Sequence, residues 1–148
     1  MLFQKTNKTN LTISLCFFAF PLLIGLLNYI VLAPETIVAE AFTQIFKIEF
    51  SFQTTNKFLI LCRNYLSDIC WSVSLINALT LIIGTKRIQI VVSLITATSF
   101  CIFIESAQFF GIIKGTFDYW DILLETLSII ITLYLTTKIR RFKNEKPT

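Results

Sequence analysis

Residues Phe103–Leu127 read FIESAQFFGIIKGTFDYWDILLETL, and this stretch joins the ends of two long apolar segments. It is strongly hydrophobic, yet it carries four of the nine acidic residues of the chain, Glu105, Asp118, Asp121 and Glu125. Ionised side chains are costly to bury in hydrocarbon. Their concentration here indicates where the polar chemistry of a membrane protein lies.

The whole chain has the composition of an integral membrane protein. Of its 148 residues, 55% are hydrophobic and 15% are charged, and the mean hydropathy is +0.73. A soluble domain of this length contains less apolar sequence. The length favours one domain, residues 1–148. The net charge of +4 does not indicate a nucleic-acid-binding protein, because the basic residues stand at the ends of the apolar runs.

Four stretches are long enough to cross a bilayer, which takes about 20 apolar residues. They are residues 11–32, 65–83, 88–110 and 118–137, with the start of the last placed between 117 and 121. The predicted fold class is therefore all-α, a membrane bundle of four transmembrane helices. The first stretch is too long for a signal peptide and has no clear small-residue cleavage site, so we predict that it is a retained anchor.

The basic residues set the predicted orientation. Nine stand on one side of the spans, namely Lys5, Lys8, Lys86, Arg87, Lys138, Arg140, Arg141, Lys143 and Lys146. Four stand on the other, namely Lys47, Lys57, Arg63 and Lys114. Because positive loops stay in the cytoplasm, both termini are predicted to be cytoplasmic.

Residues 33–64 form a long loop on the predicted extracytoplasmic side. Pro34 and Glu35 are typical of a helix start. Apolar residues then recur with helical period between Ile37 and Phe46, which predicts an amphipathic helix on the membrane surface. The next stretch, Phe46–Phe52, alternates apolar and polar residues as a strand does, although it has no obvious partner strand.

The polar residues of the spans gather at the extracytoplasmic end. Asn28 ends the first span and Asp68 begins the second, while Glu105 and Gln108 share one face near the end of the third. Asp118, Asp121 and Glu125 share a face at the start of the fourth. We expect them to converge on an outward-facing polar pocket, with Lys114 and Arg63 as the available counter-charges. The alternative is structural: Asp118, Asp121 and Asp68 are also placed to stabilise helix starts, with Thr116 as a cap, and Gln108 to join helices.

Metal and cofactor sites are not expected. The chain has no histidine and no Cys-x-x-Cys pair, so a zinc site is not expected. The chain has four cysteines, Cys16, Cys62, Cys70 and Cys101, of which three lie in or beside apolar runs. They are interpreted as buried thiols of the membrane segments.

The same residues carry a family resemblance. The stretch Ile104–Leu127 resembles the VanZ-like family of small bacterial membrane proteins, in which Glu-x-x-Gln precedes a short loop with a basic residue, Gly-Thr-Phe-Asp and a second Asp. Glu105, Gln108, Lys114, Gly115, Thr116, Phe117, Asp118 and Asp121 stand at these positions, and Asp68 and Trp71 match an upstream Asp-x-x-Trp. The chain departs from the pattern at Glu125, where the family usually has Asn, and at Ser128, where it has Gly.

The resemblance implies a multi-pass protein of the bacterial cytoplasmic membrane with a cell-envelope role, and founding members are associated with resistance to the glycopeptide teicoplanin. Membrane lipids, a lipid headgroup, a cell-wall precursor or a glycopeptide are then the expected partners. The first hypothesis is a non-enzymatic binding protein. The second is a membrane enzyme that acts on a lipid-linked envelope substrate with paired carboxylates, although no established catalytic motif is present. A transporter ranks last, because no inverted repeat is evident.

Overall fold

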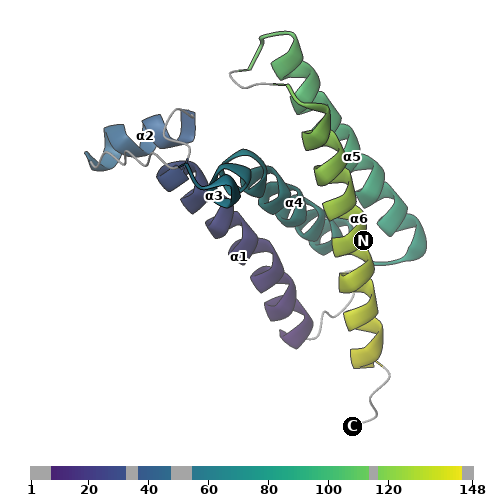
Figure 1. The fold of residues 1–148 in the computed structure, drawn as a ribbon. Helices are drawn as coiled ribbons and strands as arrows, with labels where there is room; N and C mark the ends of the chain where they lie inside the picture. The colour runs from purple at the N-terminus through teal and green to yellow at the C-terminus, as the bar shows by residue number, and fades with distance from the viewer. Residues whose placement is uncertain (1–7, 33–36, 48–54, 114–116, 145–148) are drawn as a thin grey trace.

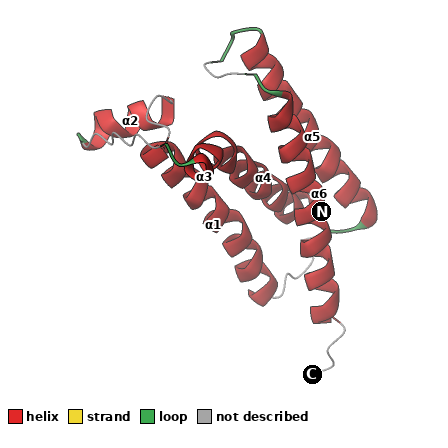
Figure 2. Ribbon diagram, in the orientation of Figure 1, coloured by secondary structure: helices red, strands yellow, loops and turns green. Residues whose placement is uncertain are grey.

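Every element is helical in the part of the chain that the computed structural model describes, residues 8–32, 37–47, 55–113 and 117–144 (Figure 2). In chain order the elements are α1 (Lys8–Leu32), α2 (Ile37–Phe46), α3 (Lys57–Leu61), the π-helical turn η1 (Cys62–Leu66), α4 (Ser67–Ile83), α5 (Arg87–Phe109) and α6 (Tyr119–Asn144).

The prediction of four spanning helices is confirmed. The helical stretches long and apolar enough to cross a membrane are Leu15–Leu32, Lys57–Ile83, Arg87–Phe109 and Tyr119–Ile139. Their outer faces carry large exposed apolar side chains, among them Phe20, Ile82 and Phe103. Exposure on this scale is unfavourable in water, so the chain is a multi-pass membrane protein.

The helix that contains the predicted second span begins earlier than the span itself. The helix begins at Lys57 rather than residue 65 and runs through α3, η1 and α4 to Ile83. Asn56 caps it, since its Oδ1 accepts the Phe58 N–H at 2.9 Å. Arg63 and Asn64 lie within this helix, not before it, and their side chains remain exposed. Helix α6 likewise continues beyond the predicted end at residue 137 to Asn144.

Helix α2 confirms the predicted helix in the loop between the first two spans. Glu40, Ala41 and Gln44 are exposed, while Phe42 and Thr43 are half-buried. In Figure 1, α2 runs across the end of α1 rather than along it. The predicted strand lies outside the described residues from 48 onward, and its first residue, Phe46, belongs to α2.

Helix α4 is the centre of the bundle. It packs against α1 on one side and against both α5 and α6 on the other. Helices α5 and α6 run antiparallel, side by side (Figure 1). Gly84 makes the tight turn from α4 into α5, and its φ of 109° is one that residues with a side chain rarely adopt.

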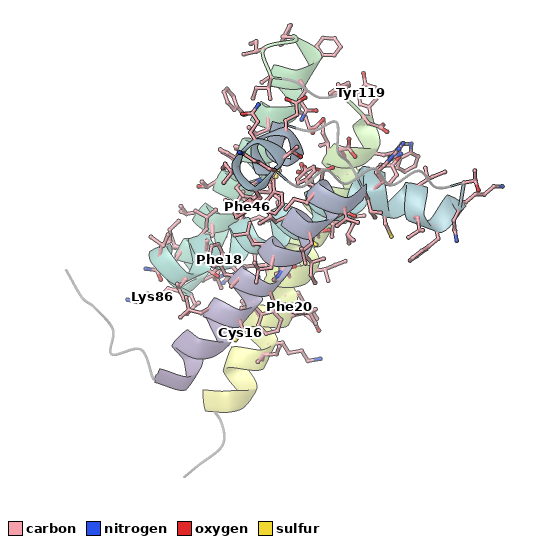
Figure 3. All side chains as sticks on the ribbon, turned by 90° about the vertical axis from the view of Figure 1, so that its left-hand side faces the viewer. Cys16, Phe18, Phe20, Phe46, Lys86 and Tyr119 are labelled. Atoms are coloured by element: carbon pink, nitrogen blue, oxygen red, sulfur yellow. The ribbon has the colours of Figure 1, made fainter. Side chains whose placement is uncertain are left out.

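The bundle has two chemically different ends. We call the end at which α1 and α5 finish and α4 and α6 begin the acidic end, because Asp68, Glu105 and Asp121 lie there. The opposite end, with Lys86, Arg87 and Lys138, is the basic end. Figure 3 labels Lys86 and Tyr119, which lie at these opposite ends.

The apolar core lies where α4, α5 and α6 meet. Ile76, Ala97, Cys101, Ile129 and Leu133 form its buried cluster. The α5 residues Ala97 and Cys101 are small, which lets helices approach closely in a membrane, where packing replaces the hydrophobic effect as the main attraction between helices.

Helices α1 and α4 are in close contact around Gly25. A Cβ placed on Gly25 would lie 3.1 Å from the Cβ of Cys70, which is tighter than ordinary packing. The Ser67 hydroxyl donates to the Gly25 carbonyl at 3.3 Å. Glycine at this position therefore sets the distance between the two helices.

The same interface contains hydrogen bonds from α4 to the turn of α1 that precedes Pro21. Proline has no N–H to donate to the carbonyl four residues earlier, and its ring crowds that turn. The Phe17 carbonyl therefore has no backbone donor from Pro21. It accepts a hydrogen bond from Asn77 Nδ2 at 3.3 Å instead. The neighbouring Phe18 carbonyl accepts the Ser74 hydroxyl at 3.0 Å. The bond from Asn77 thus replaces one that α1 lacks, and the bond from Ser74 adds a further link between the helices.

Asn77 extends this network to a third helix. Its side chain is 1% exposed, and its Oδ1 accepts the Thr136 hydroxyl of α6 at 3.2 Å. The neighbouring Thr137 instead donates to the Tyr134 carbonyl of its own helix at 2.9 Å. Thr136 therefore joins two helices, whereas Thr137 bonds within its own helix and is less buried.

We expect Thr136→Val to lower the free energy of unfolding by about 0.5–2 kcal/mol, because one interhelical hydrogen bond in a membrane contributes that much. Thr137→Val is the matched control and should change it by less than about 0.5 kcal/mol. Titration of the purified protein with SDS in mixed micelles measures both. Equal effects of the two substitutions would contradict the role of Asn77 as a junction.

Candidate functional site

The carboxyl groups of three helices meet at the acidic end. We call Asp68 of α4, Glu105 of α5, and Asp118, Asp121 and Glu125 at the start of α6 the acidic cluster. Asp68, Glu105 and Asp121 each act electrostatically on Glu125. Asp68, Glu105 and Asp118 each act on Asp121. The carboxyls singled out in the sequence therefore lie together.

Two members of the acidic cluster are deeply buried. Glu105 is 4% exposed and Glu125 is 6% exposed. The Oε2 atom of each is buried and has no hydrogen-bond partner among the described residues, and the same holds for Oδ1 of Asp121. A buried oxygen without a partner costs about 1–3 kcal/mol, so this arrangement is not one that stability alone would favour.

Repulsion adds to this cost. The described charged groups that act on Glu105, Asp121 and Glu125 are all carboxylates, and hence negative. Carboxyl groups crowded together in an apolar setting cannot all stay ionised without a cation or a proton. The acidic cluster is thus suited to a positively charged or hydrogen-donating group.

Two tyrosines and a cysteine complete the surroundings of the acidic cluster. The Tyr29 hydroxyl donates to Asp68 Oδ1 at 3.1 Å, and the Tyr65 hydroxyl donates to Asp118 Oδ2 at 3.4 Å. The Cys101 side chain hydrogen-bonds to Glu125. Sequence reasoning missed all three. Tyr65 had a signal, because it stands three residues before Asp68 and so shares its helix face.

Asn28 supports the site from α1. It is 5% exposed, and its Nδ2 donates to Ser67 Oγ at 2.7 Å and to the Cys62 carbonyl of η1 at 3.2 Å. These bonds fix the end of α1 against the start of α4. They place the Tyr29 hydroxyl, one residue further along α1, against Asp68.

Asp118 combines the two roles that were weighed from the sequence. Its Oδ1 accepts the Trp120 N–H at 3.0 Å, and its carbonyl accepts the Asp121 N–H at 3.1 Å, so it caps α6. Its backbone N–H donates to Glu105, and its other carboxyl oxygen accepts the Tyr65 hydroxyl. Capping and membership of the acidic cluster are therefore compatible.

The remaining predicted site residues are more scattered. Gln108 is half-buried on α5. Arg63 is exposed, and its Nε lies 3.5 Å from Asn64 Oδ1 rather than against an acid. Trp71 is 44% exposed on α4. Lys114, Gly115 and Thr116 lie outside the described residues.

A protein-bound metal ion is not indicated. Within residues 8–32, 37–47, 55–113 and 117–144, no group of three or more His, Cys, Asp or Glu side chains is arranged to hold one. The cysteines are all free thiols, with Cys70 and Cys101 buried as predicted, Cys62 intermediate and Cys16 exposed on α1.

Comparison of the chain with protein-family models, with curated proteins and with solved structures gives no match in any of the three. The resemblance to the VanZ-like family therefore stays a prediction, and it depends on the motif residues alone. What the geometry establishes is a multi-pass helical membrane protein with a buried acidic cluster at one end of its bundle.

Proposed function

We propose that this chain is a VanZ-like protein of the bacterial cytoplasmic membrane, with both termini cytoplasmic and the acidic cluster on the extracytoplasmic side. Its function is to bind an envelope molecule, such as a lipid headgroup, a cell-wall precursor or a glycopeptide, through a cationic or hydrogen-donating group. Protection against teicoplanin is the phenotype that we propose for it.

The observation that carries this proposal is the pair of buried glutamates with unpartnered oxygens. Acids within membrane spans are expensive, and proteins keep them mainly where they bind or move something. A group that donates hydrogen bonds to Glu105 and Glu125 would supply what the described residues lack. The basic residues at the opposite end support the orientation, because positive charge favours the cytoplasmic side.

The phenotype can be tested in cells challenged with teicoplanin and with a second envelope stress. We expect Glu105→Gln and Asp118→Asn to lose protection to the same degree, at normal abundance in the membrane. Asparagine also caps helices, so the second change spares the start of α6. Glu40→Gln on α2 is the matched control for carboxylate removal outside the acidic cluster and should keep protection.

Two outcomes would contradict the proposal. If neither cluster variant changes any phenotype at normal abundance, the acidic cluster is structural. If Glu40→Gln has the same effect as the cluster variants, general loss of acidic charge is responsible. Mass spectrometry of lipids that copurify with the wild type and not with Glu105→Gln would identify the bound molecule.

A membrane enzyme is the second candidate. It is favoured by the presence of two buried carboxyl groups in one cluster, because differing surroundings can make one an acid and the other a base. Turnover of a purified lipid-linked envelope substrate by the wild type, with at least a hundredfold loss in Glu105→Gln, would favour it. Binding of that substrate without turnover would exclude it in favour of the binding protein.

A further inference from the structure

A second concave feature lies at the basic end of the bundle, away from the acidic cluster. A groove of about 600 Å³ runs between α5 and α6. Ile90, Ile130 and Leu133 contribute its apolar lining, and Thr85, Arg87 and Thr137 contribute its polar residues. This volume falls within the range of small-ligand sites, about 300–1,000 Å³.

The apolar part of the groove opens toward the hydrocarbon. Val91 of α5 is 48% exposed and Ile130 of α6 is 49% exposed, although both line the groove. Each belongs to a membrane-spanning helix. A hydrocarbon chain can therefore enter from the side without leaving the membrane interior.

The polar part of the groove is positively charged. Arg87 lines it, Lys86 precedes α5, and the Lys138 ammonium lies 5.7 Å from the centre of the Tyr134 ring. The first turn of α5 contains no acidic residue, and the acidic residues of the spanning helices lie at the other end. Such a site favours an anion, and cations near a membrane surface each contribute about 1 kcal/mol toward anionic lipids.

We propose that this groove binds one anionic phospholipid, with an acyl chain along Ile90, Ile130 and Leu133 and the phosphate at Arg87 and the Thr85 hydroxyl. Charge complementarity selects an anionic headgroup, and the side opening selects a lipid over a free phosphate, which has no use for the apolar lining. Arginine suits this role because its planar guanidinium forms paired hydrogen bonds with phosphate oxygens.

Native mass spectrometry of the delipidated full chain in a neutral detergent tests this proposal. The probes are phosphatidylglycerol and phosphatidylcholine with the same acyl chains. The wild type should retain phosphatidylglycerol at least about fivefold better, as about 1 kcal/mol per cationic contact requires. Arg87→Gln should remove that preference. Val91→Trp, which fills the groove and keeps the charge, should weaken binding of both lipids.

Lys57→Gln is the control, because Lys57 lies at the acidic end of the bundle and does not line the groove. This variant should bind lipid as the wild type does. Circular dichroism checks that each variant keeps its helices; Arg87 is exposed and its replacement should not affect folding. Unchanged lipid retention in both groove variants would overturn the proposal, as would inorganic phosphate displacing the lipid as effectively as phosphatidylglycerol. A wild-type dimer that Val91→Trp dissociates would also overturn it, by assigning the groove to a second copy of the chain.

Discussion

Asn77→Leu should lower the free energy of unfolding by on the order of 3 kcal/mol, although leucine has nearly the same size and branching as asparagine. The change deprives the Phe17 carbonyl and the Thr136 hydroxyl of their partner. Each polar group left unpaired in an apolar interior costs about 1–3 kcal/mol. SDS titration in mixed micelles or thermal unfolding of the purified protein measures the loss.

A double-mutant cycle with Pro21 separates this explanation from simple loss of packing. Pro21→Ala restores a backbone N–H that can donate to the Phe17 carbonyl within α1. Asn77→Leu should therefore cost less in the Pro21→Ala background, by about 1 kcal/mol or more. Additive effects would show that Asn77 does not compensate for the proline.

Glu125→Leu should have the opposite sign and raise the free energy of unfolding by about 1–3 kcal/mol. It removes a buried oxygen without a partner and the repulsion from Asp68, Glu105 and Asp121. Replacing buried charged groups by apolar residues of similar volume is often neutral or stabilising. Within the described residues, the substitution gives up the bond with the Cys101 thiol, which is a weak donor.

The same substitution should abolish the proposed protection, because it removes a carboxyl group of the binding site. A gain in stability together with a loss of function is typical of a residue that is kept for function at a cost in stability. Asp118→Ala provides the contrast. It removes the cap of α6 and should destabilise by about 1 kcal/mol. A large loss of stability in Glu125→Leu would contradict the functional role and make Glu125 a structural residue. The measurements are unfolding free energies alongside growth under teicoplanin.

Much of the fold was predictable because transfer to hydrocarbon is dominated by side-chain polarity. Hydropathy predicted the four spans, and helical periodicity predicted α2. Hydropathy did not show that the helix of the second span begins as early as Lys57, because Arg63 and Asn64 were interpreted as loop residues. At a helix end such side chains reach water, so they carry little information about where the helix begins.

The acidic cluster was predictable for a related reason. Glu105, Asp118, Asp121 and Glu125 have fixed phases on helices joined by a short link, so depth and face could be estimated. The contributions of Tyr29 and Cys101 could not, since they depend on which faces of α1 and α5 turn toward the acids. That is a matter of helix packing, and neither residue differs in polarity from many others along the chain.

The proline in α1 has a consequence for biogenesis. Helix α1 leaves the ribosome before α4, and until α4 arrives the Phe17 carbonyl has no donor in the lipid. A newly inserted α1 is therefore an incomplete helix that hydrocarbon solvates poorly. Insertion of α4 supplies the missing hydrogen-bond donor. The first two spans should therefore enter the bilayer as a pair, and α1 should stay beside the insertion machinery until α4 has packed against it.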